Sequence, residues 1–195
     1  MESAGDAAGE SHAEAHAFLS ARVAITVALL ATFLGVCKVK DDNIVQAMQQ
    51  AQADKLDHWN FYQARNIREE VATAALAELK LASASAPAAQ LAGYEQEIKK
   101  YEALVTDQTS KKAELQAQAE EDQRNYDALN YRDDQFDLSD ALVAMAISLL
   151  AITVLTRKTW LYWVALVPTV GGVVIGLAGL FGWHLHPDML ARLLS

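Results

Sequence analysis

Cysteine and proline are scarce in this sequence, and the motifs of familiar catalytic sites are missing. The single cysteine, Cys37, excludes an internal disulfide framework and any multi-cysteine metal site. The chain contains no phosphate loop, no dinucleotide fingerprint, no serine-nucleophile elbow and no zinc-protease helix. We therefore predict no catalytic residues, no metal ligands and no bound cofactor, and we predict that the chain is not an enzyme.

Basic residues are also few, and their scarcity limits the partners. The chain has 16 lysines and arginines against 25 aspartates and glutamates, which gives a formal net charge of -9 at pH 7. Negative charge repels the phosphate backbone of nucleic acids, so we exclude nucleic acid as a partner. Residues 1–15 combine acidic residues with alanine, glycine and serine. We predict that they form a disordered acidic tail.

Three stretches lack charge altogether: residues 23–37, 141–156 and 159–183. Hydrocarbon has to be crossed by backbone that satisfies its own hydrogen bonds, which for such stretches means helices of about 20 residues. With their flanks, these stretches predict transmembrane helices at residues 16–37, 138–156 and 159–184, a loop at 157–158 and a C-terminal tail at 185–195. Membrane lipid is therefore an expected partner.

Residues 38–137, between the first two spans, are strongly helical in composition. Residues 44–84 contain neither glycine nor proline, and alanine, glutamine, glutamate and leucine dominate. Pro87 lacks a backbone N–H, so the chain is expected to turn near residues 83–89. Two long helices joined by a short turn pack as an antiparallel pair. We thus predict an all-α fold with three transmembrane helices and a long antiparallel helical-hairpin (coiled-coil) stalk inserted between the first and second.

The second stalk helix carries a heptad pattern that indicates a helix–helix seam. The two seam series are Leu91, Ile98, Val105, Lys112, Ala119, Tyr126 and Asp133, and Tyr94, Tyr101, Gln108, Leu115, Asp122, Leu129 and Phe136.

Four charged residues are expected at the membrane interface: Arg22, Asp140, Arg157 and Lys158. The positive-inside rule places the 157–158 loop in the cytoplasm and therefore favours a periplasmic stalk. Lys38 and Lys40 argue the other way, although long loops escape this rule. For Asp140 we favour a headgroup position at a helix N-terminus over an ion site within the membrane.

A glycine face lies on the third span, where Gly172, Gly176 and Gly179 have i, i+4 and i+7 spacing. Glycines on one face let two helix backbones approach closely. We predict a helix-packing or oligomer face, and its partner is either another span of this chain or a second copy.

An aromatic and basic patch lies in the first half of the stalk. It consists of Trp59, Phe61, Tyr62, Arg65 and Arg68. One interpretation is a surface that binds a ligand or partner. The interpretation that we favour is packing against the second stalk helix or a neighbouring subunit, because Glu69 and Glu70 can neutralise the arginines.

The run KDDNIVQAMQQA at residues 40–51, followed by WNFYQA at residues 59–64, resembles the signature of an uncharacterised bacterial membrane-protein family. This family is known only as domain of unknown function 4337. The resemblance covers roughly residues 22–183. It implies one span, a long helical insert, two closing spans and a bacterial inner-membrane location, and it implies no activity or ligand.

These patterns lead us to expect a structural or scaffold protein that forms homo-oligomers. Its stalk would serve self-assembly or the docking of another envelope or membrane-complex protein. An alternative is an oligomeric channel or transporter subunit, supported by Asp140, Arg22 and the glycine face. A third is an accessory subunit of a larger membrane enzyme complex.

Overall fold

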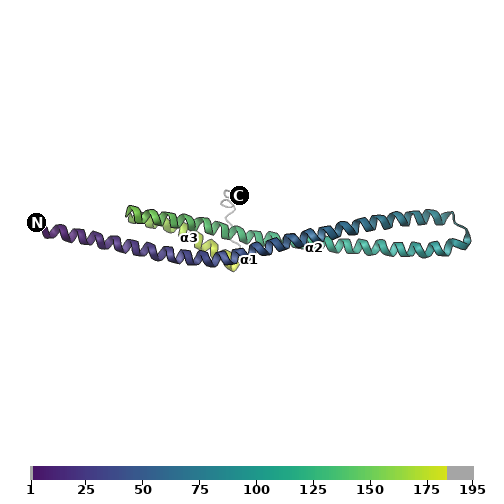
Figure 1. Cartoon of the computed structure of the whole chain (residues 1–195), viewed down its shortest axis with the longest axis horizontal. Coiled ribbons are helices and arrows are strands. Elements are labelled where there is room, and N and C mark those ends of the chain that lie inside the picture. Colours follow the sequence, from purple (N-terminus) through teal and green to yellow (C-terminus); the bar gives the residue numbers. More distant parts are fainter. Residues whose placement is uncertain (1, 184–195) are drawn as a thin grey trace. The chain divides into compact units, whose positions relative to one another are not determined.

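The structure, a computed structural model, describes the backbone of residues 2–183. Side chains are described for residue 14 and for residues 16–183. Three helices follow one another along the chain: α1 (Glu2–Ala84), α2 (Ala88–Thr156) and α3 (Thr159–Phe181) (Figure 1). The described part of the chain contains no strand, so the predicted all-helical class is confirmed.

Helix α1 is continuous through three segments that we predicted separately: the tail, the first transmembrane helix and the first stalk helix. It begins at Glu2, so the structure places residues 2–15, which we assigned to a disordered tail, in a helix. Alanine, the best helix former, is frequent there and proline is absent. The charged residues that follow Cys37 mark a change of polarity, yet lysine and aspartate can sit within a helix, and α1 continues through them. The predicted tail at 185–195, like residue 184, lies outside the described residues.

Contacts within the chain divide it into two compact units, and each is described by itself. Unit 1 contains the described residues up to Gln46 and from Leu129 onward. Unit 2 contains residues 47–128.

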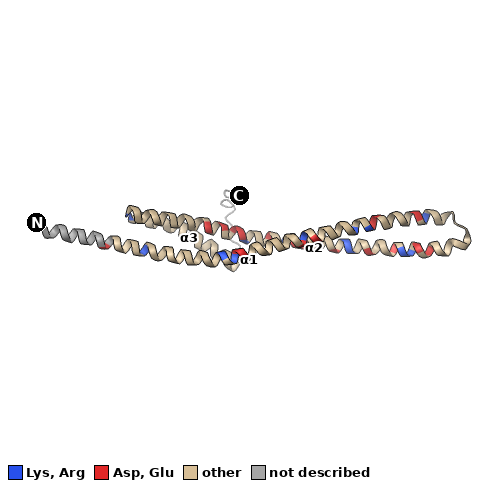
Figure 2. Cartoon of the chain, viewed as in Figure 1, with Lys and Arg blue, Asp and Glu red and all other residues tan. Residues whose placement is uncertain are grey.

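Unit 1 has an apolar core to which all three helices contribute. The buried cluster consists of Val23, Leu30, Val143, Ala146, Leu150 and Ala165. Tyr162 of α3 and Thr26 of α1 share a hydrogen bond of 3.2 Å between their hydroxyl groups. Within the described residues, three helices are long and apolar enough to cross a membrane. Figure 2 shows the corresponding parts of α2 and α3 almost free of charged residues.

Many large apolar side chains of unit 1 are nevertheless exposed. They include Ile25 and Leu29 on α1, Met145 and Leu155 on α2, and Val167 on α3. A soluble protein rarely leaves so much apolar surface in contact with water, whereas lipid tails solvate it without penalty. This surface is compatible with a membrane protein.

Unit 2 consists of one segment of α1 and one of α2. His58 of α1 pairs with Asp122 of α2, and Lys80, further along α1, pairs with Glu102, which comes earlier in α2. The two segments therefore run in opposite directions. Residues 85–87 connect the helices, and Ser85 N–H donates to the Ala82 carbonyl oxygen at 3.2 Å.

The two seam series predicted on α2 are mostly turned away from solvent within unit 2. Gln108 and Ala119 are buried, and the other members up to Tyr126 are half-buried except Leu91, which is exposed. Regular coiled-coil packing remains a prediction.

Candidate functional site

The glycine face of α3 packs against other helices of the same chain. Gly172, Gly176 and Gly179 are all buried. A Cβ added to Gly172 would lie 2.7 Å from Val143 Cγ2, and one added to Gly176 would lie 2.6 Å from Ser139 Oγ and 2.7 Å from Phe33 Cζ. The structure therefore fills this face with α2 and α1. None of the three glycines is left at the surface for a second copy.

Three polar side chains of α2 donate hydrogen bonds to backbone carbonyl oxygens of α3 and of Trp183, just beyond its end. Arg132 Nη2 donates to the Gly179 carbonyl oxygen at 3.0 Å, and Gln135 Nε2 donates to that of Trp183 at 2.8 Å. Ser139 Oγ donates to the carbonyl oxygen of Gly172 at 2.8 Å. Gly179 is among the last four residues of α3, whose carbonyls have no partner within the helix and carry partial negative charge, so Arg132 holds the end of α3 in place. Gln135 holds the chain just beyond that end, and Ser139 contacts the middle of α3 at Gly172.

Acidic residues of α1 and α2 come together at one edge of unit 1. Asp41 is 5% exposed, and its Oδ2 accepts a hydrogen bond from Lys38 Nζ at 2.8 Å. Asp137 and Asp140 of α2 line a cavity of about 30 Å³ together with Asp41. Burial, a hydrogen bond with Asp41 and the nearby Asp137 raise the pKa of Asp133 to about 6.

The pKa values of Asp137 and Lys38 are also shifted beside Asp41. Burial is the main cause that raises the pKa of Asp137, and the charge of Asp41 raises it further. The hydrogen bond to Asp41 raises the pKa of Lys38. The edge therefore concentrates negative charge around a single ammonium group.

A line of polar contacts connects the two helices of unit 2. Lys112 Nζ lies 2.5 Å from Glu69 Oε2, and His58 Nδ1 lies 2.7 Å from Asp122 Oδ2. The hydrogen bond from Lys112 lowers the pKa of Glu69, and the same bond raises the pKa of Lys112. These pairs fix the register of the helices because each long side chain reaches a specific partner.

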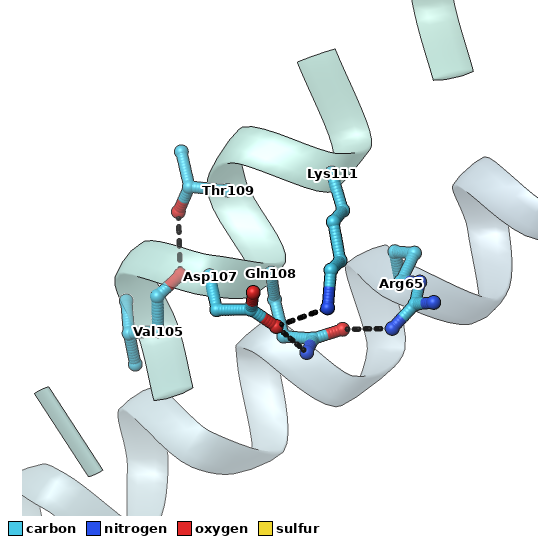
Figure 3. Close-up of polar contacts among 6 residues, drawn as sticks. All are labelled: Arg65, Val105, Asp107, Gln108, Thr109 and Lys111. Atoms are coloured by element: carbon cyan, nitrogen blue, oxygen red, sulfur yellow. Dashed lines mark hydrogen bonds and ion pairs between the residues drawn. The ribbon is translucent and has the colours of Figure 1, made fainter. Parts of the chain in front are cut away.

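The buried Gln108 of α2 connects the helices through its amide oxygen, and its amide nitrogen is satisfied within α2. Its Oε1 accepts from Arg65 Nη1 at 3.1 Å, and its Nε2 donates to Asp107 Oδ2 at 3.0 Å (Figure 3). Lys111 Nζ also donates to Asp107 Oδ2, at 2.8 Å. A buried amide requires such partners, because an unsatisfied one costs about 1–3 kcal/mol.

The structure divides the predicted aromatic and basic patch between two sides of α1. Trp59 and Tyr62 are half-buried and meet edge to face, with ring centroids 5.2 Å apart. Arg65 is half-buried and reaches α2 through Gln108. Phe61 and Arg68 are exposed. The patch is therefore not one continuous surface.

The four predicted interface charges are exposed side chains of unit 1. The Arg22 guanidinium lies 4.1 Å from the centroid of the Phe18 ring. Arg157, with φ of 56°, and Lys158 form the connection between α2 and α3. Asp140 is exposed and lines the acidic cavity.

Sequence reasoning missed Asp41 and Asp133 as a pair and Ser139 as a contact of α3. In the sequence, Asp41 stood out only as part of the family signature at residues 40–51, and Asp133 only as a member of a seam series. Among the described residues, no group of three or more histidine, cysteine, aspartate or glutamate side chains could hold a metal ion. Nothing in these residues points to catalysis.

Comparisons with known proteins agree with the sequence signature. Neither a search of curated proteins nor a search of solved structures finds a match. The family model of a domain of unknown function, DUF4337, matches residues 19–182, which include most of the described helices. The chain belongs to this family.

Proposed function

We propose that this chain is a membrane-anchored structural protein of the bacterial inner membrane that assembles with copies of itself through α1. The anchor would be unit 1, whose helices combine sufficient length with an exposed apolar surface. Unit 2 is rich in charge and would lie in water. The observation that carries the proposal is an exposed apolar face of α1 within unit 2.

This face holds every large apolar side chain of α1 within unit 2 that is strongly exposed. Each member is between 59% and 75% exposed, and they are Leu56, Phe61, Ile67, Val71 and Leu81. All five fall on adjoining positions of one heptad frame, in which Val71 is an a residue and Ile67 a d residue. Most half-buried and buried residues of this segment fall on the remaining positions, although Asp54 and Ala75 share the e position with Phe61. Helix α1 thus has one face for α2 and another that no described residue of the chain covers.

A second copy is the occupant that the pattern favours. Copies inserted with the same topology have α1 helices that run in the same direction, as a parallel coiled coil requires. From Leu56 to Leu81 the face extends about 38 Å at 1.5 Å per residue, and this length accommodates between three and four heptads. Asn60 takes a d position and adds a polar residue to the seam.

Acidic residues limit the length of the contact. Asp57 and Glu78 occupy a positions, where each would meet the same residue of the partner. Like charges facing one another are unfavourable. The closest approach is therefore expected between them, at Ala64, Ile67 and Val71.

The mass of the protein extracted from native membranes tests the proposal. The wild-type chain, of 21.3 kDa, should be found as a multiple of that mass in a mild detergent or in lipid discs. The double variant Ile67→Asp with Val71→Asp places charge in the seam and should yield monomers. The matched control is Leu104→Asp, an exposed apolar residue of α2 in unit 2, which should remain assembled.

Cross-linking identifies the face directly. In a Cys37→Ala background, Ile67→Cys should form a cross-linked dimer in native membranes, whereas Glu114→Cys on α2 should not. Both positions are exposed in the structure, so accessibility does not distinguish them. A monomeric wild-type chain in the mass measurement, together with no cross-linked dimer of Ile67→Cys, would contradict the proposal.

A periplasmic position of unit 2 is part of the proposal. In the Cys37→Ala background, Thr106→Cys should react with a membrane-impermeant maleimide in intact cells whose outer membrane has been made permeable. Reaction only after lysis would place unit 2 in the cytoplasm.

A further inference from the structure

Asp41 of α1 is a buried carboxylate with only part of its hydrogen-bonding capacity satisfied. Its Oδ2 accepts from Lys38 Nζ at 2.8 Å, whereas its Oδ1 is buried without any donor. A buried acceptor in this situation is costly, and more so when it carries charge. A further hydrogen-bond donor to Asp41 Oδ1 would therefore stabilise the folded protein.

A candidate for that donor is the half-buried carboxyl group of Asp133 on α2, whose pKa is raised in part by a side-chain hydrogen bond with Asp41. Two ionised carboxylates can only accept hydrogen bonds, so their contact requires a proton on one of them. Asp41 forms an ion pair with Lys38 at 2.8 Å, and Asp133 is the partner whose pKa is raised. The proton therefore belongs on Asp133.

The charges around this pair come from two helices. Helix α1 supplies Lys38 and Asp42, which lie 3.5 Å apart between Nζ and Oδ1. Helix α2 supplies the carboxylates of Asp134 and Asp137, which add negative charge next to Asp133, and Asp140 acts on Asp137. Helix α3, from Thr159 to Phe181, contains no charged residue. Apart from Lys38, the surroundings repel a second negative charge.

We propose that Asp41 and Asp133 form a proton-binding site that joins α1 to α2 in unit 1. The proton resides on Asp133, which donates it to Asp41, and Asp41 accepts from Lys38 with its other oxygen. Loss of the proton leaves the buried carboxylate of Asp41 facing the half-buried carboxylate of Asp133, so the contact between the helices weakens. Proton uptake then strengthens the packing of unit 1.

Infrared spectroscopy of the full-length protein in lipid discs tests the site. The carbonyl-stretch band of a protonated carboxylic acid should be present in mildly acidic buffer and should disappear as the pH passes about 6, the pKa of Asp133. Asp133→Asn should abolish this transition, because its amide donates permanently to Asp41. The matched control is Asp134→Asn, the next residue on α2, which should retain the transition. A transition of unchanged size in Asp133→Asn would overturn the proposal.

A second variant keeps the test decisive if Asp133→Asn fails to fold. Asp41→Asn removes the negative charge and the acceptor beside Asp133, so the midpoint of the transition should move to lower pH. An unchanged midpoint in Asp41→Asn would show that Asp133 titrates independently of Asp41 and would refute the pair.

The nature of the bound ion can be tested in the same samples. The cavity of about 30 Å³ beside Asp41 has room for a water molecule or a small cation, so a metal cation is the alternative to a proton. The titration should have the same midpoint in sodium chloride and in N-methylglucamine chloride of equal ionic strength. A lower midpoint in sodium alone would assign the site to a metal cation and overturn the proton assignment.

Discussion

Ser139 of α2 and Gly172 of α3 are joined by a hydrogen bond at the centre of unit 1, with 2.8 Å between the hydroxyl and carbonyl oxygens. Both residues are buried. The contact is possible because α3 presents hydrogen atoms rather than side chains to α2 along its glycine face. The hydroxyl group also lies where a side chain at Gly176 would begin.

Adding a methyl group at Gly176 should therefore destabilise the protein. The new Cβ would lie 2.6 Å from Ser139 Oγ and 2.7 Å from Phe33 Cζ, so α2 or α1 has to move. We expect Gly176→Ala to lower the free energy of unfolding by about 1–3 kcal/mol, as overpacking does. Thermal unfolding in detergent, followed by circular dichroism, measures this effect.

Gly35 provides the control for that substitution. No atom lies within 4 Å of a Cβ at Gly35, and the residue is inside α1. Gly35→Ala should stabilise the helix by about 0.5–1 kcal/mol, because alanine loses less conformational freedom than glycine. Equal effects of the two substitutions would show that the glycine face does not bring the helices together.

Stability should decrease as the pH rises through the titration of Asp133. An ordinary aspartate has a pKa of 3.8, and that of Asp133 in the folded protein is about 6. The folded state therefore keeps the proton where the unfolded chain has lost it. The resulting stabilisation is complete below the ordinary pKa, is lost as the pH rises through about 6, and is absent above it.

Urea unfolding across this pH range measures the effect. Asp133→Asn should flatten the pH dependence, and the remaining slope should come from Asp137, whose pKa is raised in the same direction. A wild-type stability that increases over the same range would contradict the raised pKa.

Substitution of Glu69 should destabilise unit 2, whereas substitution of its neighbour Glu70 should have little effect on stability. Glu69 pairs with Lys112 across the two helices at 2.5 Å, whereas Glu70 is exposed and accepts only from Asn66 on its own helix. Glu69→Gln should lower the melting temperature, and Glu70→Gln should change it little. Because the pKa of Glu69 is lowered, its contribution should be lost as the pH falls through that lowered value. A larger effect at Glu70 would argue against pairing across the helices.

The sequence allowed the helical class and the three apolar helices to be predicted, because both depend on local composition. Charge-free stretches indicate where the apolar helices lie, and Pro87 indicates the break between α1 and α2. Helix ends were less predictable at Cys37 and Asp137. There the polarity changes, but no residue prevents the helix from continuing, and both α1 and α2 pass through.

The contacts of the site were beyond sequence reasoning for a different reason. The spacing of Gly172, Gly176 and Gly179 showed a packing face, but not which helix covers it. Asp41 and Asp133 lie far apart along the chain, and only the packing of α1 against α2 brings them together. Even the aromatic and basic patch, although close in sequence, is split because Phe61 and Tyr62 point to different sides of one helix.

Arg132 should contribute to stability through the end of α3. Its guanidinium donates to the Gly179 carbonyl oxygen at 3.0 Å, near the C-terminus of a helix whose last residues carry partial negative charge. Arg132→Gln removes the positive charge, and we expect the free energy of unfolding to decrease by about 1–2 kcal/mol. Arg124→Gln, at an exposed arginine of α2, is the control and should change stability by less than about 0.5 kcal/mol. If both variants unfold like the wild type, Arg132 does not hold the end of α3.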